Sequence, residues 1–314
     1  MSTQATRNVP NPTGIGAHSA AKVNVPTKSI MQRLGRKMAE RVWWWGCQIL
    51  LVVLLAFVAF PFYWSVVTTL KTPPEQFAKV PTFLPHPLTF DNYKWVFEHK
   101  DFMRSLRNSM ILAPLGAIGA VVLTTTFGYS LARYRYRGKK AIITFLVATQ
   151  MLPGVLTIVP LFVVFAKLKL VNTYLGLLLG YWTFSVPFSA LMLRGFFNNF
   201  PVELEEAALI DGCSRLGAFI RITLPLTIPG IVTVALFAFV GVWNDLLFAL
   251  VLTRDLDAMT ATVFLSNMIT QQYSSTNWGG MIAVGSVLTI PTVIFFVFLQ
   301  RAIITGMTAG AIKG

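Results

Sequence analysis

The amino-acid sequence predicts an all-α polytopic membrane protein with six transmembrane helices, and three observations predict it. Hydrophobic residues make up 55% of the 314-residue chain. Charged residues make up only 12%, which is about half the fraction typical of soluble domains. Six apolar stretches are each long enough to cross the roughly 30 Å hydrocarbon core of a bilayer. They cover residues 47–70, 109–131, 141–166, 174–193, 226–252 and 280–299.

The chain before the first stretch divides into two parts. Residues 1–28 are rich in Asn, Pro, Thr, Ser and Gly, and we expect a disordered extension there. Residues 29–45 place Ile30, Leu34 and Met38 at helical spacing with basic residues between them, which predicts an interfacial amphipathic helix on the inner leaflet. A plain continuation of the first span is the alternative. The transmembrane domain then covers residues 46–314.

Lysine and arginine residues predict the orientation of the spans. With the N-terminus inside, the segments between the spans hold 17 basic residues on the inner side and nine on the outer side. Because cytoplasmic loops carry an excess of Lys and Arg, both termini are expected in the cytoplasm. Membrane topology also explains the net charge of +14 better than a nucleic-acid partner does.

The inner segment 194–225 gathers four of the twelve acidic residues of the chain. Pro201 and the carboxylates that follow it are typical of a helix N-terminus, where negative charge complements the helix dipole. Gly212 suits the left-handed residue that ends a helix. These signals predict a short helix over residues 202–211.

This short helix would carry apolar residues on two opposite sides, with the carboxylates between them. Two apolar sides suggest contact with this chain on one side and with another protein on the other. A solvated loop helix without a special role is the alternative. The two sides consist of Leu204, Ala207 and Ala208, and of Val202 and Leu209.

A second helix is expected after the glycine, capped by Ser214 and ended by Pro225. Helix, glycine corner and helix together would form a stiff bracket between two spans. Four residues at helical spacing would give the second helix one buried face. They are Leu216, Phe219, Ile220 and Thr223.

Asp245 is the one charged residue within the six apolar stretches. A carboxylate there costs about 2.5–3.5 kcal/mol on insertion scales, so it is expected to face the bundle interior or water. With Asn244 it is a candidate for the polar wall of a translocation path, and an interhelical hydrogen bond is the alternative. Gln150 is a weaker candidate, near Pro153 and Pro160, which should bend the third stretch.

Other kinds of site are not indicated. The sequence holds no P-loop motif for nucleotide binding. His18, His86 and His99 lie far apart, so neither a metal site nor a catalytic triad is expected. Cys47 and Cys213 lie in different contexts and predict no disulfide framework. We therefore expect no enzyme activity, metal or cofactor in this chain.

Several motifs carry a resemblance to a known family. Glu206-Ala207-Ala208, followed by Asp211-Gly212 and by the ITLP of residues 222–225, resembles the cytoplasmic loop of binding-protein-dependent ABC transporter permeases. From about residue 45 to its end the chain is similar to the MalG-like sugar permeases of maltose-type importers. The supporting matches are LTFDNYKWVF (88–97), LARYRYRGKK (131–140), WND (243–245) and GMTAGAIKG (306–314).

The resemblance implies the type I ABC importer, or MetI-like, permease fold in a multi-pass subunit of the bacterial inner membrane. The implied partners are a second, MalF-like permease subunit, two ATPase subunits that bind ATP and Mg, and an extracytoplasmic sugar-binding protein. The implied substrate is a disaccharide or oligosaccharide of the maltose or trehalose kind. A sugar phosphate or a polyol is the alternative substrate, and an ion-coupled secondary transporter is the alternative class.

The resemblance also implies site residues. In such permeases the loop helix docks in a cleft of an ATPase subunit, and the C-terminal tail, here residues 300–314, reaches along the ATPase subunits. The coupling contact carries over to Glu206, Ala207, Ala208, Leu209, Asp211 and Gly212, and the tail contact to Gly306, Gly310 and Gly314. An outer loop would contact the binding protein through Gln271, Gln272, Tyr273, Asn277 and Trp278.

Overall fold

The computed structural model describes residues 30–270 and 277–311, with side chains for 39–270 and 277–300. The chain divides into two units, Met1–Ala59 and Phe60–Gly314. Every regular element in the described ranges is helical. The disorder expected over 1–28 concerns residues outside these ranges.

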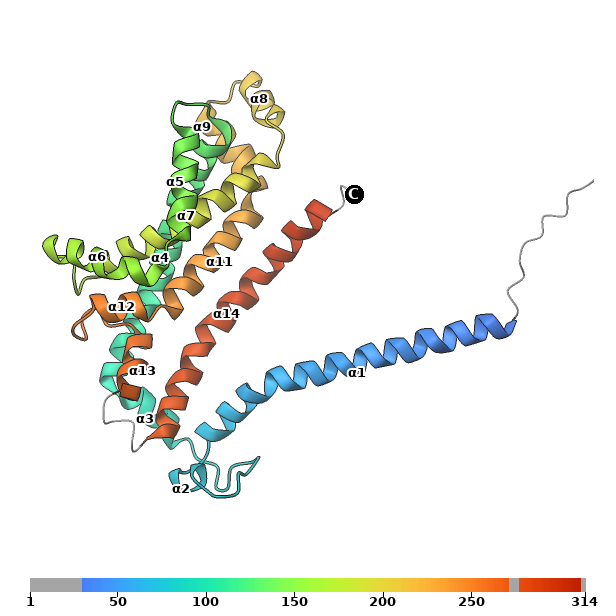
Figure 1. Ribbon diagram of the computed structural model, residues 1–314, viewed down its shortest axis with the longest axis vertical. Coiled ribbons are helices and arrows are strands. Elements are labelled where there is room, and N and C mark those ends of the chain that lie inside the picture. The colour runs from blue at the N-terminus through green and yellow to red at the C-terminus, as the bar shows by residue number, and fades with distance from the viewer. Residues whose placement is uncertain (1–29, 271–276, 312–314) are drawn as a thin grey trace, which may run out of the picture. The chain divides into compact units, whose positions relative to one another are not determined.

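The first helix, α1, runs without a break from Ile30 to Thr69 (Figure 1). The sequence predicts an interfacial helix over 29–45, and the structure continues residues 30–45 into the first span as one helix. The position of this segment on the membrane surface stays a prediction. Gly46 is the weakest helix former near the expected junction, and a single glycine costs only about 1 kcal/mol relative to alanine. Within α1, residues 39–69 are long and apolar enough to cross a membrane.

Three further single helices have the length and composition of a membrane span. They are α4 (Lys100–Arg133), α7 (Tyr174–Asn198) and the Trp278–Gln300 part of α14 (Trp278–Ala311). Two bent helix pairs bring the number of candidate spans to six if each pair is one span. The all-helical fold is therefore confirmed, whereas six spans and cytoplasmic termini stay predictions.

The first bent pair is α5 (Lys139–Met151) and α6 (Gly154–Lys167), which meet at 105°. Pro153 lies at the break, and this confirms the bend expected there, because proline removes a backbone donor and clashes with the preceding turn. Pro160 lies inside α6.

The second bent pair consists of residues 215–226 and α11 (Ile228–Asn244), at 74°. The first half comprises α9 (Arg215–Ala218), the π-helix η1 (Phe219–Thr223) and α10 (Leu224–Leu226). Pro225 is expected to end the helix, but the chain stays helical to Leu226. The proline occupies the first turn of α10, where its missing N–H costs nothing.

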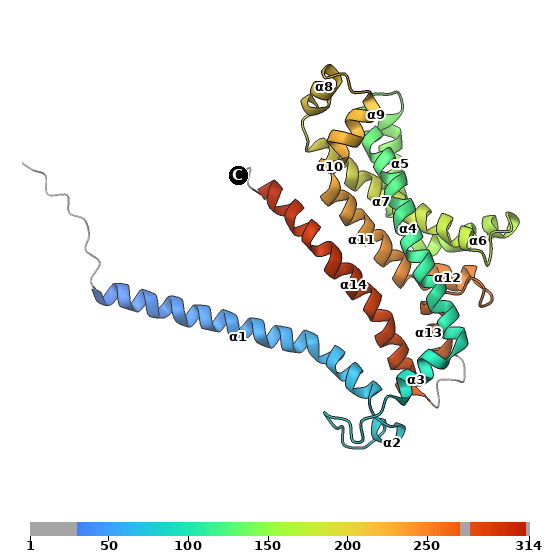
Figure 2. The ribbon, with the colours of Figure 1, turned by 180° about the vertical axis from the view of Figure 1, so that it is seen from behind.

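The core of the second unit forms where α4, α7, α11 and α14 pack together. Figure 2 shows α4 alongside α11 from the opposite side. Two indole N–H groups join neighbouring helices through backbone carbonyls. Trp182 donates to the carbonyl of Gly116 in α4, and Trp243 to that of Leu288 in α14, each at 3.0 Å.

The shorter helices lie at the two ends of this unit. The helix α8 (Glu203–Ile210) lies at one end, and α2 (Pro73–Gln76), α3 (Asp91–Glu98) and α13 (Ala261–Thr270) lie at the other (Figure 1). After α11, the chain turns into α12 (Leu247–Leu252). The stretch 226–252, predicted as one span, is therefore interrupted after Asn244.

Candidate functional site

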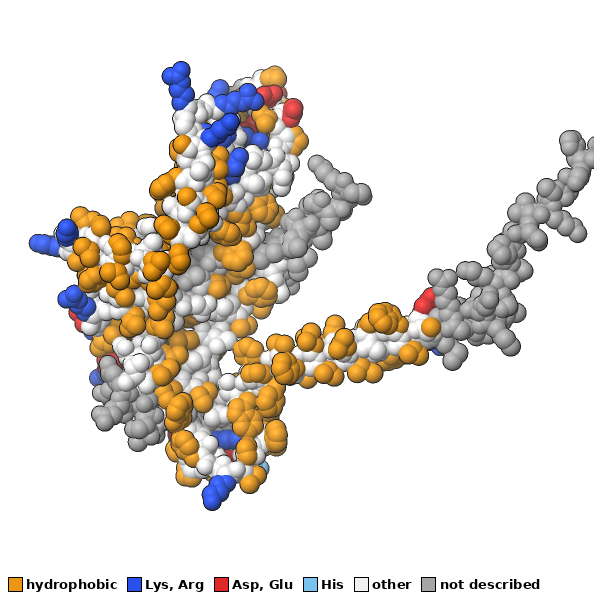
Figure 3. Space-filling model, in the orientation of Figure 1, with side chains coloured by type: hydrophobic (Ala, Val, Ile, Leu, Met, Phe, Trp, Pro, Cys, Tyr) orange, Lys and Arg blue, Asp and Glu red, His pale blue; other side chains and the backbone are white. Residues whose placement is uncertain are grey.

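The bracket predicted over residues 202–225 is present at the α8 end of the bundle. The helix α8 covers Glu203–Ile210, which confirms the short helix, and Gly212 has φ +87°, which confirms the left-handed corner. The Ser214 hydroxyl accepts the N–H of Gly217 at 3.1 Å and caps α9, as expected. Figure 3 shows that Lys, Arg, Asp and Glu side chains gather at this end.

The buried face of α8 differs from the prediction. Ala208 is buried, but Leu204 and Ala207, assigned to the same side, are exposed, and so are Val202 and Leu209 on the other side. The other buried residue is Glu205, which is only 9% exposed. The helix therefore turns a carboxylate inward from between its two apolar sides, because that carboxylate has partners inside the subunit.

Both partners of Glu205 come from the last two turns of α4. Arg133 Nε donates to Glu205 Oε1 at 2.7 Å, and the Tyr129 hydroxyl donates to Oε2 at 2.8 Å. Arg133 also donates from Nη2 to the carbonyl of Phe200, at 3.1 Å. These three side chains thus tie α8 to α4 and to the chain that leaves α7.

The ring of Tyr129 is the centre of a small aromatic cluster. Its centroid lies 4.4 Å from that of Phe219 in η1 and 5.6 Å from that of Phe197 in α7. Phe197 is fully buried with Leu193 and Val234. Side chains from α4, α7, η1 and α11 therefore meet directly beneath α8.

The buried face predicted for the second helix is wrong in part. Thr223 is buried, but Leu216 and Ile220 are 66% and 49% exposed. The π-turn changes the number of residues per turn between them, so a face drawn at 100° per residue does not persist. Ala218 is buried instead.

The outer surface of the bracket carries exposed apolar side chains. Of the six residues that the resemblance assigns to coupling, Glu206, Ala207, Leu209, Asp211 and Gly212 are exposed, and Ala208 is buried. Ile210 is 86% exposed, and Val202, Leu204 and Leu216 are each at least 45% exposed. An exposed apolar surface with acidic residues around it is typical of a protein interface.

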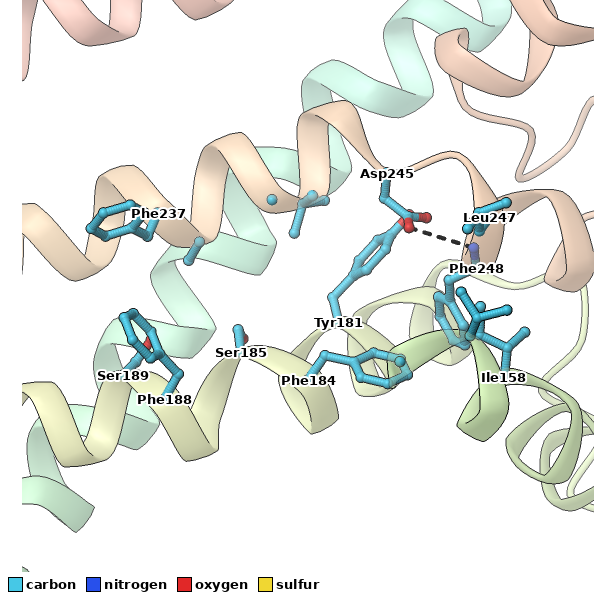
Figure 4. A pocket seen from close by; sticks show the side chains of 15 residues that line it. Ile158, Tyr181, Phe184, Ser185, Phe188, Ser189, Phe237, Asp245, Leu247 and Phe248 are labelled. Atoms are coloured by element: carbon cyan, nitrogen blue, oxygen red, sulfur yellow. Dashed lines mark hydrogen bonds between the residues drawn. The ribbon is translucent and has the colours of Figure 1, made fainter. Parts of the chain in front are cut away.

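A cavity of about 480 Å³ lies between α6, α7, α11 and α12 (Figure 4). Aromatic rings form much of its wall, and the rings of Phe188 and Phe237 meet edge to face with centroids 6.1 Å apart. Ser185 and Ser189 supply hydroxyl groups, and Asp245 is the one charged residue among the described residues that line it. The remaining lining residues are Gly154, Val155, Ile158, Tyr181, Phe184, Ala238, Gly241, Val242, Leu247 and Phe248.

Asp245 lies at the interruption between α11 and α12. One carboxylate oxygen accepts the N–H of Ala249 at 2.9 Å, and the other accepts that of Phe248 at 3.4 Å. The Tyr181 hydroxyl donates to the first oxygen at 3.3 Å. Asp245 therefore caps the start of α12, and its hydrogen bond with Tyr181 is the interhelical contact named as the alternative. It also faces the cavity, but its place in a translocation path stays a prediction.

The two other candidates for the path do not line this cavity. Asn244 ends α11 and is exposed, and Gln150 is exposed and donates to the carbonyl of Leu146 in its own helix, at 3.1 Å. The sequence interpretation misses the rings of Tyr181, Phe184 and Phe188. Their spacing of three and four residues along α7 is a signal that could have found them.

The remaining predicted contacts are described only in part. The side chain of Asn277 accepts the N–H of Gly280 at 2.8 Å and begins α14, and Trp278 is half-exposed. Gly306 and Gly310 belong to α14, which continues to Ala311. Gln271, Gln272, Tyr273 and Gly314 lie outside the described residues. No group of three or more potential metal ligands occurs among the described residues.

A helical bundle with two bent helix pairs, a bracket at one end and a largely apolar cavity that holds a few polar groups is an arrangement suited to a multispan transport protein. The family model "Binding-protein-dependent transport system inner membrane component" matches residues 124–309. The chain belongs to this family, and the predicted resemblance is confirmed. It is an ABC transporter permease subunit and not an enzyme.

Two relatives and one solved structure show how close the similarity is. The diacetylchitobiose uptake system permease protein DasC of Streptomyces coelicolor is 33% identical over 89% of this chain and 99% of its own. The trehalose transport system permease protein SugB of Mycobacterium tuberculosis is 35% identical over 88% and 99%. A crystal structure of a bacterial ABC transporter that imports the acidic polysaccharide alginate has a TM-score of 0.73 at 20% identity, over 84% of this chain and 97% of that one. That likeness shows the MetI-like permease fold.

Proposed function

We propose that this chain is the transmembrane permease subunit of an ATP-driven importer of neutral disaccharides or oligosaccharides of the trehalose or maltose kind. It forms half of the translocation path in a bacterial inner membrane, with both termini in the cytoplasm. The relatives named for diacetylchitobiose and trehalose support the sugar class. The cavity of α6, α7, α11 and α12 is the observation that carries the proposal.

The composition of the cavity suits a neutral sugar. Aromatic faces cover the apolar faces of a sugar ring, and serine and tyrosine hydroxyl groups exchange hydrogen bonds with its hydroxyls. Its volume of about 480 Å³ lies within the usual range of small-molecule sites. The described lining holds a carboxylate but neither Lys nor Arg, so a sugar phosphate would meet a like charge and no cation.

The bracket supports coupling to an ATPase. The helix α8 presents exposed apolar and acidic side chains, and its other face is held to α4. We infer that the exposed face of α8 docks on an ATPase subunit, which binds ATP and Mg. Closure of two such subunits would move the bracket as a rigid body and switch the path between its inward and outward openings.

The other partners follow from the family. A second, MalF-like permease subunit would complete the path, and an extracytoplasmic binding protein would deliver the sugar to the end of the bundle that carries Asn277 and Trp278. The C-terminal part of α14, with Gly306 and Gly310, would reach toward the ATPase subunits. Ion coupling is the competing mechanism. A transporter of that kind requires several ionisable residues within the membrane, whereas the predicted spans of this chain hold one, so ATP-driven transport is favoured.

The proposal is tested by transport in proteoliposomes that contain the full chain and its co-purifying subunits. Uptake of radiolabelled trehalose, maltose and diacetylchitobiose is measured with ATP inside and the cognate binding protein outside, and trehalose phosphate serves as the anionic competitor. We expect ATP-dependent uptake of at least one neutral sugar. Uptake driven by an ion gradient without ATP, or uptake of the phosphate alone, would contradict the proposal.

A further inference from the structure

Glu205 differs from the other acidic residues of the bracket in its surroundings. Glu203, Glu206 and Asp211 are exposed, whereas the side chain of Glu205 is 11% exposed and its partner Arg133 is 9% exposed. Each carboxylate oxygen of Glu205 already accepts a hydrogen bond from α4. This carboxylate is therefore directed at its own subunit.

The connection joins parts of the chain that are distant in sequence. Arg133 and Glu205 are 72 residues apart, and α4 is not a neighbour of the bracket along the chain. Backbone connections lead from α8 to α7 on one side and through α9 and η1 to α11 on the other. The contact with α4 adds a third route from α8 into the bundle.

A gain in folding stability alone does not explain why Glu205 and Arg133 form a buried ion pair. Taking two charges out of water costs about as much as their attraction returns, and apolar residues of similar volume often replace a buried pair without loss. Removing one member, in contrast, leaves an uncompensated buried charge. A pair of this kind does fix the relative position of the two helices that carry it, because the guanidinium and the carboxylate bind each other in one defined geometry.

We propose that Glu205, Arg133 and Tyr129 form a strut that transmits displacement of α8 to α4 during transport. Glu205 is a positioning residue in this scheme, because it acts through α4. Its exposed neighbour Glu206 is the residue that would contact the ATPase. The inference rests on the proposed docking of α8. With the strut, α4 moves together with α7 and α11, and without it α8 moves while α4 stays behind.

The test uses the full complex in proteoliposomes and measures sugar uptake, ATP hydrolysis and their ratio. Glu205→Gln removes the charge at constant shape. The double variant Glu205→Leu with Arg133→Met replaces the pair by apolar residues that keep the fold. Glu98→Gln in α3 and Arg135→Gln just after α4 remove exposed charges of the same type outside the proposed docking face, and they are the matched controls. A cysteine cross-link from position 207 reports whether α8 still contacts the ATPase.

We expect both strut variants to lose about tenfold or more in sugar transported per ATP hydrolysed, a coupling loss of the size seen for residues along such a route. Expression, thermal stability of the apolar double variant, and the cross-link should stay at the level of the controls. Wild-type uptake and coupling in the apolar double variant would overturn the proposal. If Glu205→Gln fails to assemble, the result for the apolar double variant is sufficient to decide. An absent cross-link in the chain that carries Ala207→Cys and no strut substitution would instead show that the docking of α8 is wrong.

Discussion

The Tyr181 hydroxyl lies 3.3 Å from the carboxylate of Asp245 and joins α7 to the interruption between α11 and α12. The same carboxylate accepts the N–H groups of Phe248 and Ala249 in the first turn of α12. A carboxylate at this depth in an apolar bundle is thus satisfied by its own subunit, and its free edge still faces the cavity. The wall of the cavity depends on this cap.

Replacement of Asp245 separates its two roles. Asp245→Ala should destabilise the start of α12 by about 0.5–2 kcal/mol, the usual cost of losing an N-cap. Asp245→Asn keeps an acceptor and should retain most of the stability. Thermal unfolding of the purified complex measures both, and Tyr181→Phe is the control that removes only the third hydrogen bond. Equal stability of the alanine variant and the unmodified protein would contradict the capping role.

The aromatic wall predicts a loss of apparent affinity for sugar. Phe184→Leu, Phe188→Leu and Phe237→Leu each remove a ring from the cavity, and each should raise the KM of uptake about 2- to 10-fold, the equivalent of 0.5–1.5 kcal/mol for an aromatic contact. Phe298, which is 77% exposed on α14 and lies outside the cavity, provides the matched control as Phe298→Leu. A KM unchanged in all three wall variants would exclude this cavity as the sugar path.

The corner of the bracket requires a left-handed backbone. Gly212 has φ +87° with open space around the position of a Cβ, so strain rather than a clash decides the outcome. Gly212→Val should cost about 1–2 kcal/mol locally and reduce transport, while membrane insertion persists. Gly212→Asn, which tolerates this conformation better, should keep more activity. If uptake and coupled ATPase activity survive the valine, the bracket does not act as a rigid lever.

Close packing of α7 on α12 gives a second glycine prediction of a different kind. A Cβ at Gly180 would lie 1.9 Å from the ring of Phe248. Gly180→Ala should therefore displace this ring from the cavity wall and destabilise the complex by about 1–3 kcal/mol. Gly195→Ala lies on the same helix with no atom within 4 Å of the new Cβ, and it should be harmless. Thermal unfolding of the two variants side by side checks the difference.

The loop after α1 predicts a dependence on acid pH. The Thr82 hydroxyl, which donates to Glu75 at 2.6 Å, and the backbone N–H of His86 hold the pKa of Glu75 below its ordinary value of 4.5. A depressed pKa stabilises the fold above the unfolded-state pKa, and the effect is lost as the pH falls through the folded-state pKa. Glu75→Gln should weaken the loss of stability below pH 4.5. Identical acid unfolding curves for the two proteins would contradict this assignment.

Local signals account for what the sequence predicts well. The start and end of α8 are predictable because their signals depend only on residues close in the sequence. These signals are Pro201, the acidic first turn and Gly212. The pairing of Glu205 with Arg133 is not predictable, because it depends on how α4 packs beneath the bracket. The interruption at Asp245 is hidden for a related reason, since the residues around it are apolar enough to continue a span. Tyr181 and Phe188 share a helical face, but spacing alone does not show which neighbour that face meets.

The central claim, that α8 is held by an ATPase and moves the bundle, is tested most directly by a cross-link across the docking surface. Ala207→Cys in a Cys213→Ser background is joined to a cysteine on the ATPase surface of the assembled complex, and uptake is measured before and after reduction. The account predicts an efficient cross-link that stops sugar uptake and is reversed by reductant. Failure of α8 to cross-link to any ATPase subunit, in a complex that transports sugar with ATP, would contradict it.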